Sequence, residues 1–349
     1  SGNNPQGHAA SAAIVFDYNP CLSAGDRGAD RAFYRLEDIM MNFVPSRRHM
    51  LFGAGALGIA ALAGCKPAPT PAPEAKAKSV LETWPVGVQL YTVNAELAKD
   101  IPGTLKAVKD AGYDVVETAG TQGRTAVEYK SLIEAAGLKI RSAHSNMPKL
   151  IDNLDKEIAE ALALGAEWLV CSSPKTPAPL PAGTDWITGM IKAMTLDAWK
   201  MNAEHLAAIA PVIKKAGLKL AWHNHPMEFT DLGNGQTGYD ILMAAAPADQ
   251  LRAELDLGWV AVAGADPVAM MKKYADRLDL LHVKDMIKDV AIPAGFRSTE
   301  IGKGMINWKP VFAAAQELGV KNYFIEQEPP YLKPVVESLK ESRAYIASL

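Results

Sequence analysis

Histidines and carboxylates recur in this chain at one kind of position, the end of a short apolar run. They are Glu117, His144, His223 with His225, Asp256, His282 and Glu326. Neutral imidazoles and carboxylates together are ligands for Mn, Zn, Co or Fe, whereas a site made only of oxygens suits Mg or Ca better. The residue types therefore predict one bound divalent metal ion, with the transition metals favoured over Mg.

A metal site of this kind would hold a polyol or hydroxyketone by neighbouring oxygens and stabilise an enediolate as a Lewis acid. Lys284, a free carboxylate or a free histidine would then move protons. Because side chains two residues apart on a strand share a face, His223 and His225 are expected to point the same way, and so are His282 and Lys284. The predicted reaction is proton abstraction next to a carbonyl group.

A phrase that recurs from residue 84 onward predicts the elements that position these side chains. A helical stretch ends in a glycine, three to six apolar residues follow as a buried strand, and a polar or small residue closes the strand. The glycines of five copies are Gly112, Gly137, Gly165, Gly217 and Gly319. Three more strands are predicted over 86–91, 251–256 and 280–284, which brings the count to eight.

Helices are predicted between the strands, over 101–111, 151–164, 196–216, 267–278, 308–318 and 334–349. Eight alternations of strand and helix over residues 84–349 match the roughly 250 residues of an α/β fold of the (β/α)8 barrel type. A doubly wound sheet is the alternative, but it needs a glycine-rich phosphate loop after an early strand, and we find none. The active site of such a barrel lies at the carboxyl ends of the strands, where the histidines and carboxylates fall. Any one of these histidines could simply be a core residue whose ring nitrogens hydrogen-bond to backbone groups. Four histidines at one end of the barrel are not explained in this way.

Seven phrases make residues 84–349 resemble the sugar phosphate isomerase/epimerase superfamily, the xylose-isomerase-like barrels. They are Val86-Gly-Val-Gln-Leu-Tyr91, Gly112-Tyr-Asp-Val-Val-Glu117, Trp222-His-Asn-His-Pro-Met-Glu-Phe229, Glu254-Leu-Asp-Leu-Gly-Trp259, Leu281-His-Val-Lys-Asp285, Ile301-Gly-Lys-Gly304 with Trp308, and Ile325-Glu-Gln-Glu328. The set in this order is specific to the superfamily and not to one reaction.

The resemblance implies which residues hold the metal. The family takes ligands from strands five to eight, at positions that match His223, Asp256, His282 and Glu326. The strand-five residue is Glu in well-studied epimerases and His here, so one member of their two-glutamate proton relay is missing, which counts against simple C3 epimerisation. The nearby Glu228 could supply the lost carboxylate.

Further residues are candidates for contacts with substrate or for proton transfer. His225 is an alternative ligand or a substrate contact, and we favour His223 as the ligand by its position. The aromatic candidates for stacking on a sugar, each with a core position as its alternative, are Tyr91, Trp222, Trp259 and Trp308. His144 and Glu117 are candidates for the complementary acid and for orienting hydroxyls. Lys284 and Glu326 are candidate proton carriers, although Lys284 could instead balance the charge of Glu326 or Asp256.

The loop 174–185 after the fourth strand is rich in proline. Its twelve residues are at the length where connecting loops become uncommon, which favours a lid over a plain connection.

Residues 1–83 are predicted to lie outside the barrel. Residues 41–65 contain the basic pair Arg47-Arg48, a charge-free run over 51–64 and then Cys65, which is typical of an export signal and too short for a comfortable membrane span. The arginine pair resembles a twin-arginine signal, and Leu62-Ala63-Gly64-Cys65 resembles a bacterial lipobox. Residues 66–83 are rich in Pro and Ala, a composition that is typical of an extended spacer. Residues 1–40 are expected to be a non-native or disordered extension, with Met40 or Met41 as the true start.

These segments predict a periplasmic or cell-envelope protein that contacts the membrane only through a lipid on Cys65. The formal net charge of -3 is wrong for a protein that binds nucleic acid, and three cysteines are too few for a disulfide framework.

The leading interpretation is a metal-dependent isomerase or epimerase acting on a carbohydrate or keto-sugar. A lyase or dehydratase acting on an oxidised sugar, such as a 3-keto-glycoside or an inosose, follows closely, because a metal enolate can be reprotonated or can expel a β-oxygen. A DNA-repair nuclease of the endonuclease IV type would need further ligands and a basic surface. A non-catalytic sugar-binding lipoprotein would have no need of ligands on four strands.

Overall fold

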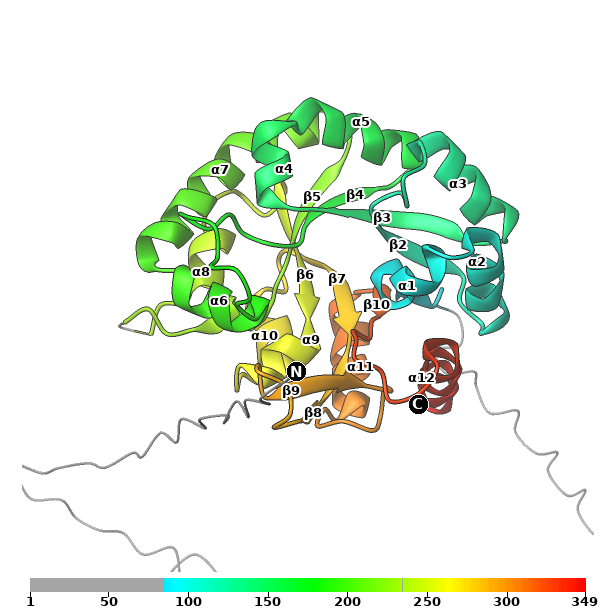
Figure 1. Ribbon diagram of the computed structural model, residues 1–349. Helices are drawn as coiled ribbons and strands as arrows, with labels where there is room; N and C mark the ends of the chain where they lie inside the picture. The colour runs from blue at the N-terminus through cyan, green and yellow to red at the C-terminus, as the bar shows by residue number, and fades with distance from the viewer. Residues whose placement is uncertain (1–83, 234) are drawn as a thin grey trace, which may run out of the picture. The chain divides into compact units, whose positions relative to one another are not determined.

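Eight parallel strands close into a barrel in the part of the chain that the computed structural model describes, residues 84–349 apart from 234 (Figure 1). In chain order they are β1 (Gly87–Gln89), β2 (Val115–Ala119), β3 (Lys139–Ser145), β4 (Trp168–Cys171), β5 (Lys219–His223), β6 (Leu251–Asp256), β7 (Leu278–Val283) and β10 (Asn322–Ile325). Each strand pairs with its neighbour in the chain, and β10 pairs with β1 to close the ring. The predicted (β/α)8 barrel is confirmed.

Helices lie on the outside of the strands (Figure 1). The longer ones are α2 (Ile101–Asp110), α3 (Ala126–Ala135), α5 (Leu154–Leu164), α7 (Leu196–Lys215), α11 (Trp308–Leu318) and α12 (Val335–Ser348). The short ones are η2 (Leu90–Val93), α1 (Asn94–Leu97), α4 (Met147–Asp152), α6 (Trp186–Ala193), η3 (Pro226–Phe229), α8 (Gly238–Met243), α9 (Leu257–Val262) and α10 (Pro267–Lys273). The helix predicted over 151–164 is two helices, α4 and α5, separated at Asn153, and that predicted over 267–278 ends at Lys273.

The glycines of the recurring phrase end helices as predicted. All five have positive φ, and Gly165 and Gly319 are left-handed C-caps with φ of 75° and 73°. A residue with a Cβ rarely adopts this conformation, so glycine is favoured where the chain turns from helix into strand. Helix starts are fixed as well: Thr125 forms a capping box with Glu128 at the start of α3.

The inner face of the barrel changes from apolar to polar along the strands. A buried cluster consists of Val115, Trp168, Val170, Ala221, Leu280 and Phe324. Two residues further along four of the same strands stand Glu117, His223, His282 and Glu326. Because side chains alternate along a strand, each of these polar residues points the same way as the apolar residue two places before it. The apolar layer thus supports a polar layer at the carboxyl ends.

An antiparallel hairpin, β8 (Asp285–Lys288) and β9 (Phe296–Thr299), follows β7 and was not predicted. The Asp285 carboxylate accepts hydrogen bonds from the backbone N–H groups of Gly302, Gly304 and Ile306, at 2.9, 3.0 and 3.2 Å. It therefore holds the chain between β9 and α11 against the end of β7.

Residues 1–83, with the predicted extension, export signal, Cys65 and spacer, lie outside the described residues. Within the described part of the chain, no helix combines the length and the apolar character needed to cross a membrane.

Candidate active site

A cavity of about 510 Å³ lies at the carboxyl ends of the barrel strands. Its lining includes Tyr91, His144, His223, His225, Glu326 and Glu328. All but Glu328 are residues that the sequence analysis proposed for a site. The parallel strands bring these residues together because all six stand at or just after the carboxyl ends of four strands, β1, β3, β5 and β10.

His223, Asp256, His282 and Glu326 converge beside this cavity. Each offers a ligand atom, and the four atoms all lie within 4.8 Å of one another. His282 Nδ1 is 2.7 Å from Glu326 Oε2 and 3.8 Å from Asp256 Oδ2, and His223 Nε2 is 4.0 Å from Asp256 Oδ2. Two nitrogen and two oxygen donors at such spacing fit the coordination sphere of a divalent transition metal. We call these four residues the upper group.

His225 lies beside the upper group and is not part of it. Its ring meets that of His223 edge-on, with centroids 4.9 Å apart, and its buried Nδ1 has no hydrogen-bond partner among the described residues. His223, by contrast, belongs to both sets of residues whose spacing suits a metal. His223 therefore stays the predicted strand-five ligand.

A second set of polar side chains, Glu117, His144 and Glu254, contacts the other side of the two upper-group histidines. Glu117 Oε1 lies 2.6 Å from His282 Nε2 and 2.8 Å from His144 Nε2. Glu254 Oε2 lies 2.9 Å from His144 Nε2, 3.2 Å from His223 Nδ1 and 3.3 Å from His282 Nε2. We call these three residues the lower layer.

The role predicted for Glu117 needs correction. Its carboxylate is fully buried, also accepts a hydrogen bond from Gln89 Nε2 at 2.8 Å, and is not part of the cavity lining. It therefore faces histidines and not a substrate hydroxyl. Burial alone would raise the pKa of Glu117, but His144 and His282 outweigh this and hold it well below its usual value.

The charges of the histidines differ with their neighbours. Burial and then the nearby cationic groups lower the pKa of His223 well below its usual value, which keeps the imidazole neutral. Burial acts in the same direction on His144, but the carboxylates of Glu117 and Glu254 raise its pKa to about 9. Burial, followed by the neighbouring Glu117, raises the pKa of Glu254 to about 7.

Lys284 is fully buried among three carboxylates. Its Nζ lies 2.6 Å from Glu328 Oε1 and 2.9 Å from Glu326 Oε2. It also lies 2.9 Å from Asp256 Oδ2, but this contact does not have the geometry of a hydrogen bond. Burial opposes its charge, but Asp256, Glu326 and Glu328 raise the pKa of Lys284 well above its usual value. This geometry favours the charge-balancing role over that of a neutral base.

Three of the four aromatic candidates belong to the packed interior. Trp308 is fully buried and donates from Nε1 to Asp285 Oδ2 at 2.9 Å, and Trp222 is fully buried with Nε1 directed at Glu228. Trp259 is buried with its ring centroid 4.9 Å from Lys284 Nζ. None of these three lines the cavity, whereas Tyr91 does and is 45% exposed. The prediction of substrate contacts is therefore wrong for Trp222, Trp259 and Trp308.

Glu228 is also placed differently from the prediction. It is fully buried, and Oε2 accepts a hydrogen bond from the backbone N–H of His225 at 3.0 Å. Burial raises the pKa of Glu228 to about 8. Because the carboxyl group shapes the turn after β5 and is absent from the cavity lining, it does not replace the missing glutamate of strand five.

Sequence reasoning missed Glu254, Glu328 and Trp186. Glu254 and Glu328 each stand two residues from a predicted ligand, Asp256 and Glu326, so the period of two would have placed them on the same face. Trp186 begins α6 after the proline-rich loop 174–185, lines the cavity, and packs edge-on against His225 with ring centroids 4.8 Å apart. Nothing in the local sequence distinguishes it from a core tryptophan.

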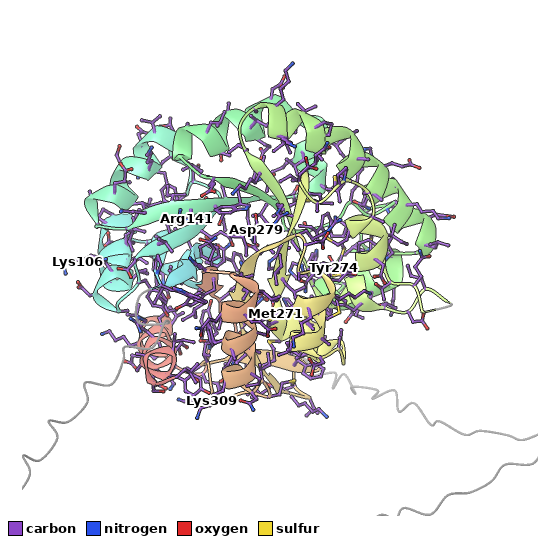
Figure 2. All side chains as sticks on the ribbon, turned by 180° about the vertical axis from the view of Figure 1, so that it is seen from behind. Lys106, Arg141, Met271, Tyr274, Asp279 and Lys309 are labelled. Atoms are coloured by element: carbon purple, nitrogen blue, oxygen red, sulfur yellow. The ribbon has the colours of Figure 1, made fainter. Side chains whose placement is uncertain are left out.

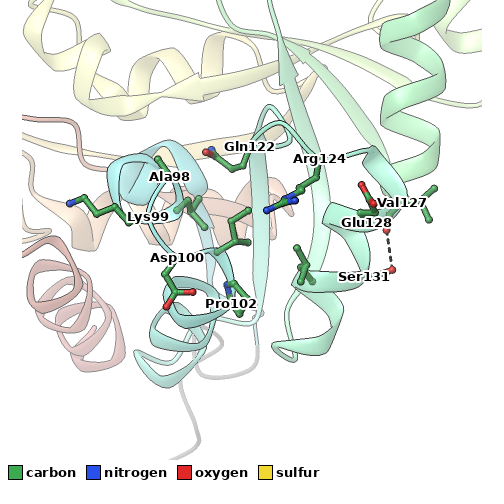
Figure 3. Close-up of a pocket in the computed structure, with 12 residues that line it drawn as sticks. Ala98, Lys99, Asp100, Pro102, Gln122, Arg124, Val127, Glu128 and Ser131 are labelled. Carbon is green, nitrogen blue, oxygen red and sulfur yellow. Dashed lines mark hydrogen bonds between the residues drawn. The ribbon is translucent and has the colours of Figure 1, made fainter.

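A second depression, of about 710 Å³, lies elsewhere on the surface, beside α1, α2 and α3 (Figure 3). Lys99, Asp100, Arg124 and Glu128 are among its lining residues, and all four are exposed. Its lining contains no histidine or cysteine. Although it is the larger of the two, it lacks the converging donors that the cavity at the strand ends provides.

Comparison with known proteins agrees with this fold and this arrangement. The profile described as "Xylose isomerase-like TIM barrel" matches residues 105–349, so the chain belongs to this family. The chain is 28% identical over 173 residues to the inosose dehydratase of Lacticaseibacillus casei, a match that covers 44% of this chain and 56% of that protein. It is 25% identical over 263 residues to the inosose dehydratase of Geobacillus thermodenitrificans, covering 68% and 85%. The chain thus spans little more than half the length of the first of these relatives.

Solved structures give the same result. A sugar phosphate isomerase/epimerase from Parabacteroides distasonis is 26% identical with a TM-score of 0.61, covering 79% of this chain and 96% of that one. The 3-keto-D-glucoside 4-epimerase from E. coli is 14% identical with a TM-score of 0.53, covering 76% and 100%, and this likeness concerns the fold alone. The resemblance to the sugar phosphate isomerase/epimerase superfamily is confirmed.

Proposed function

We propose that this protein is a metal-dependent enzyme that abstracts a proton next to a carbonyl group of a carbohydrate or keto-sugar. The observation that carries the proposal is the upper group: four ligand atoms from His223, Asp256, His282 and Glu326 within 4.8 Å of one another beside the cavity. A divalent ion there would supply Lewis acidity toward the oxygens of a bound substrate.

The chain's own residues would bind the substrate and move its protons. His144 and Glu328 both line the cavity, and they come from β3 and from the segment after β10, so they approach the substrate from different parts of the ring. His144 is the candidate acid, because its raised pKa keeps it protonated at neutral pH. Tyr91 and Trp186, which are 45% and 40% exposed, provide aromatic surface for the sugar.

Isomerisation or epimerisation is the default outcome, and elimination is the second candidate. Two features favour elimination: inosose dehydratases are among the relatives, and strand five carries His223 where a two-glutamate relay would need a carboxylate. The same deprotonated substrate could be reprotonated or could lose a β-oxygen, depending on which acid reaches it.

We also propose that the enzyme acts outside the cytoplasm, tethered to the membrane through Cys65. The proposal is supported by the basic pair, the charge-free run and the small residues before this cysteine. A phosphorylated sugar is scarce in such a compartment, which makes an unphosphorylated substrate the better candidate.

Proton NMR of reactions in deuterated water separates the possible reactions. The full chain would be loaded with Mn²⁺, Co²⁺ or Zn²⁺ in turn and supplied with a 3-keto-glucoside or an inosose. Isomerisation incorporates deuterium next to the carbonyl and keeps all heavy atoms, whereas elimination yields an unsaturated product. The proposed chemistry is wrong if neither substrate exchanges the proton next to its carbonyl for solvent deuterium, whichever of these metals the enzyme carries.

A further inference from the structure

Glu254 contacts His223 and His282, the two histidines of the upper group. It lies on the side of their rings opposite to the carboxylates of Asp256 and Glu326. It is fully buried on β6, two residues before Asp256. Its Oε2 reaches His223 Nδ1 and His282 Nε2 at 3.2 and 3.3 Å, while Asp256 Oδ2 lies on the side of His223 Nε2 and His282 Nδ1. Each imidazole therefore directs one nitrogen to the upper group and the other to the lower layer.

This division fits the hydrogen-bonding capacity of imidazole. A neutral ring has one N–H donor and one nitrogen with a free lone pair. When the lower nitrogen of His223 or His282 donates to Glu254 or Glu117, the upper nitrogen is left with the lone pair that a metal needs. Carboxylates that bond to the second nitrogen of a metal-bound histidine fix its tautomer and make it a stronger ligand.

A second metal ion within the lower layer is the competing explanation, because His144, His223, Glu254 and His282 also have spacing that suits a metal. Two ions would however require both nitrogens of His223 and of His282 as ligands, so each ring would have to lose its only N–H proton. The contacts of 2.6 Å from Glu117 Oε1 to His282 Nε2 and 2.9 Å from Glu254 Oε2 to His144 Nε2 are also those of hydrogen bonds.

We propose that Glu254, assisted by Glu117, is a positioning residue that fixes which nitrogen His223 and His282 present to a single metal ion. The inference rests on the proposed function, because it assumes that the upper group holds the metal. Glu254 does not line the cavity and is not part of the upper group, so it would act through the two histidines.

The test is the affinity of the full chain for Co²⁺ and Zn²⁺, measured by competition with a chromogenic chelator. Glu254→Gln keeps the shape of the side chain and removes its charge. We expect the variant to bind one ion per chain about 10–100-fold more weakly than the parent. The visible spectrum of the Co²⁺ form should shift, since the ligand strength of both histidines changes.

Asp279→Asn provides the matched control. Asp279, labelled in Figure 2, stands near the amino end of β7, where it accepts a hydrogen bond from Trp168 Nε1 at 3.1 Å and pairs with Arg252. The substitution removes a carboxylate charge from the same barrel, away from the histidines, so it should lower thermal stability and leave metal affinity unchanged. Glu117→Gln is the second test variant should Glu254→Gln fail to fold, and it too should weaken binding.

The possible results separate the two proposals. Parent-like affinity in a folded Glu254→Gln protein would overturn the positioning role alone. Two ions bound by the parent and one by the variant would overturn it in favour of a second metal site. A parent that binds neither Co²⁺ nor Zn²⁺ would overturn the proposed function and this inference together.

Discussion

His282 Nδ1 lies 2.7 Å from Glu326 Oε2, although the two residues are 44 positions apart in the chain. Their strands, β7 and β10, are parallel neighbours, and His282 is in register with Phe324, two residues before Glu326. The contact therefore follows from strand order and the period of two along each strand. It places an imidazole and a carboxylate from two different strands at the floor of the same site.

The substitution Trp186→Ala tests the extent of the substrate site. Trp186 lines the cavity and is 40% exposed, so its ring is available to a bound sugar. We expect KM to rise about tenfold, which corresponds to about 1.4 kcal/mol of lost binding, with little change in kcat. Ile191→Ala on the same helix is the control, because Ile191 is similarly exposed at 42% and does not line the cavity. Equal KM values for the two variants would remove Trp186 from the site.

The substitution Lys284→Met distinguishes charge balance from proton transfer. Because Lys284 faces Asp256, Glu326 and Glu328 in a buried setting, its loss leaves carboxylates unpaired. We expect the free energy of unfolding to fall by about 3–5 kcal/mol. Chemical denaturation measures this directly. A variant with parent-like stability and full metal content but turnover reduced by roughly 10²–10⁴ would instead make Lys284 a proton carrier.

How much of the site could be predicted from the sequence depends on what kind of information each residue carries. The four upper-group residues were among the candidates because a strand end is visible as an apolar run followed by a polar residue, and the resemblance to the superfamily then selected them as the ligands. Glu254 shares a face with Asp256, but it stands within its strand and not at the end, so it was overlooked. Trp259 and Trp308 were assigned wrongly, because a tryptophan near a strand end has the same local sequence whether it faces a cavity or the core.

The fold was more predictable than its irregular parts. The glycine–strand phrase repeats because each barrel unit must stop a helix and start a buried strand, so the eight strands could be counted. The hairpin β8–β9 was missed because its two strands lie outside the barrel's alternation of strand and helix and do not follow a helix that ends in glycine. The break at Asn153 between α4 and α5 was missed because the apolar pattern continues across it.

The substitution Glu228→Gln tests the structural role of the buried carboxyl group. Because burial raises its folded-state pKa to about 8, well above that in the unfolded chain, the folded protein alone holds this proton at intermediate pH. The contribution to stability is then full below the unfolded pKa and is lost as pH rises toward about 8. We expect melting temperatures of parent and variant to match near about pH 5, with the variant more stable near about pH 8. Abolished turnover in a folded variant would restore Glu228 as a catalytic candidate.

Export and lipidation are tested by Cys65→Ser, expressed from a start at Met40 or Met41. The parent should partition into the detergent phase and the variant into the aqueous phase, because only the parent would carry a lipid. Replacement of Arg47 and Arg48 by Lys should block export if the twin-arginine route is used. Equal detergent partitioning of Cys65→Ser and parent would contradict lipidation at this cysteine.

The metal content of the purified protein, measured by elemental analysis beside that of His282→Ala, tests whether the upper group holds a metal ion. We expect one divalent transition metal per parent chain and far less in the variant. Added metal should raise the melting temperature of the parent and not that of the variant, because an ion bound only to the folded state stabilises it. A folded His282→Ala protein with the parent's full metal content and full turnover would show that the upper group is not the metal site.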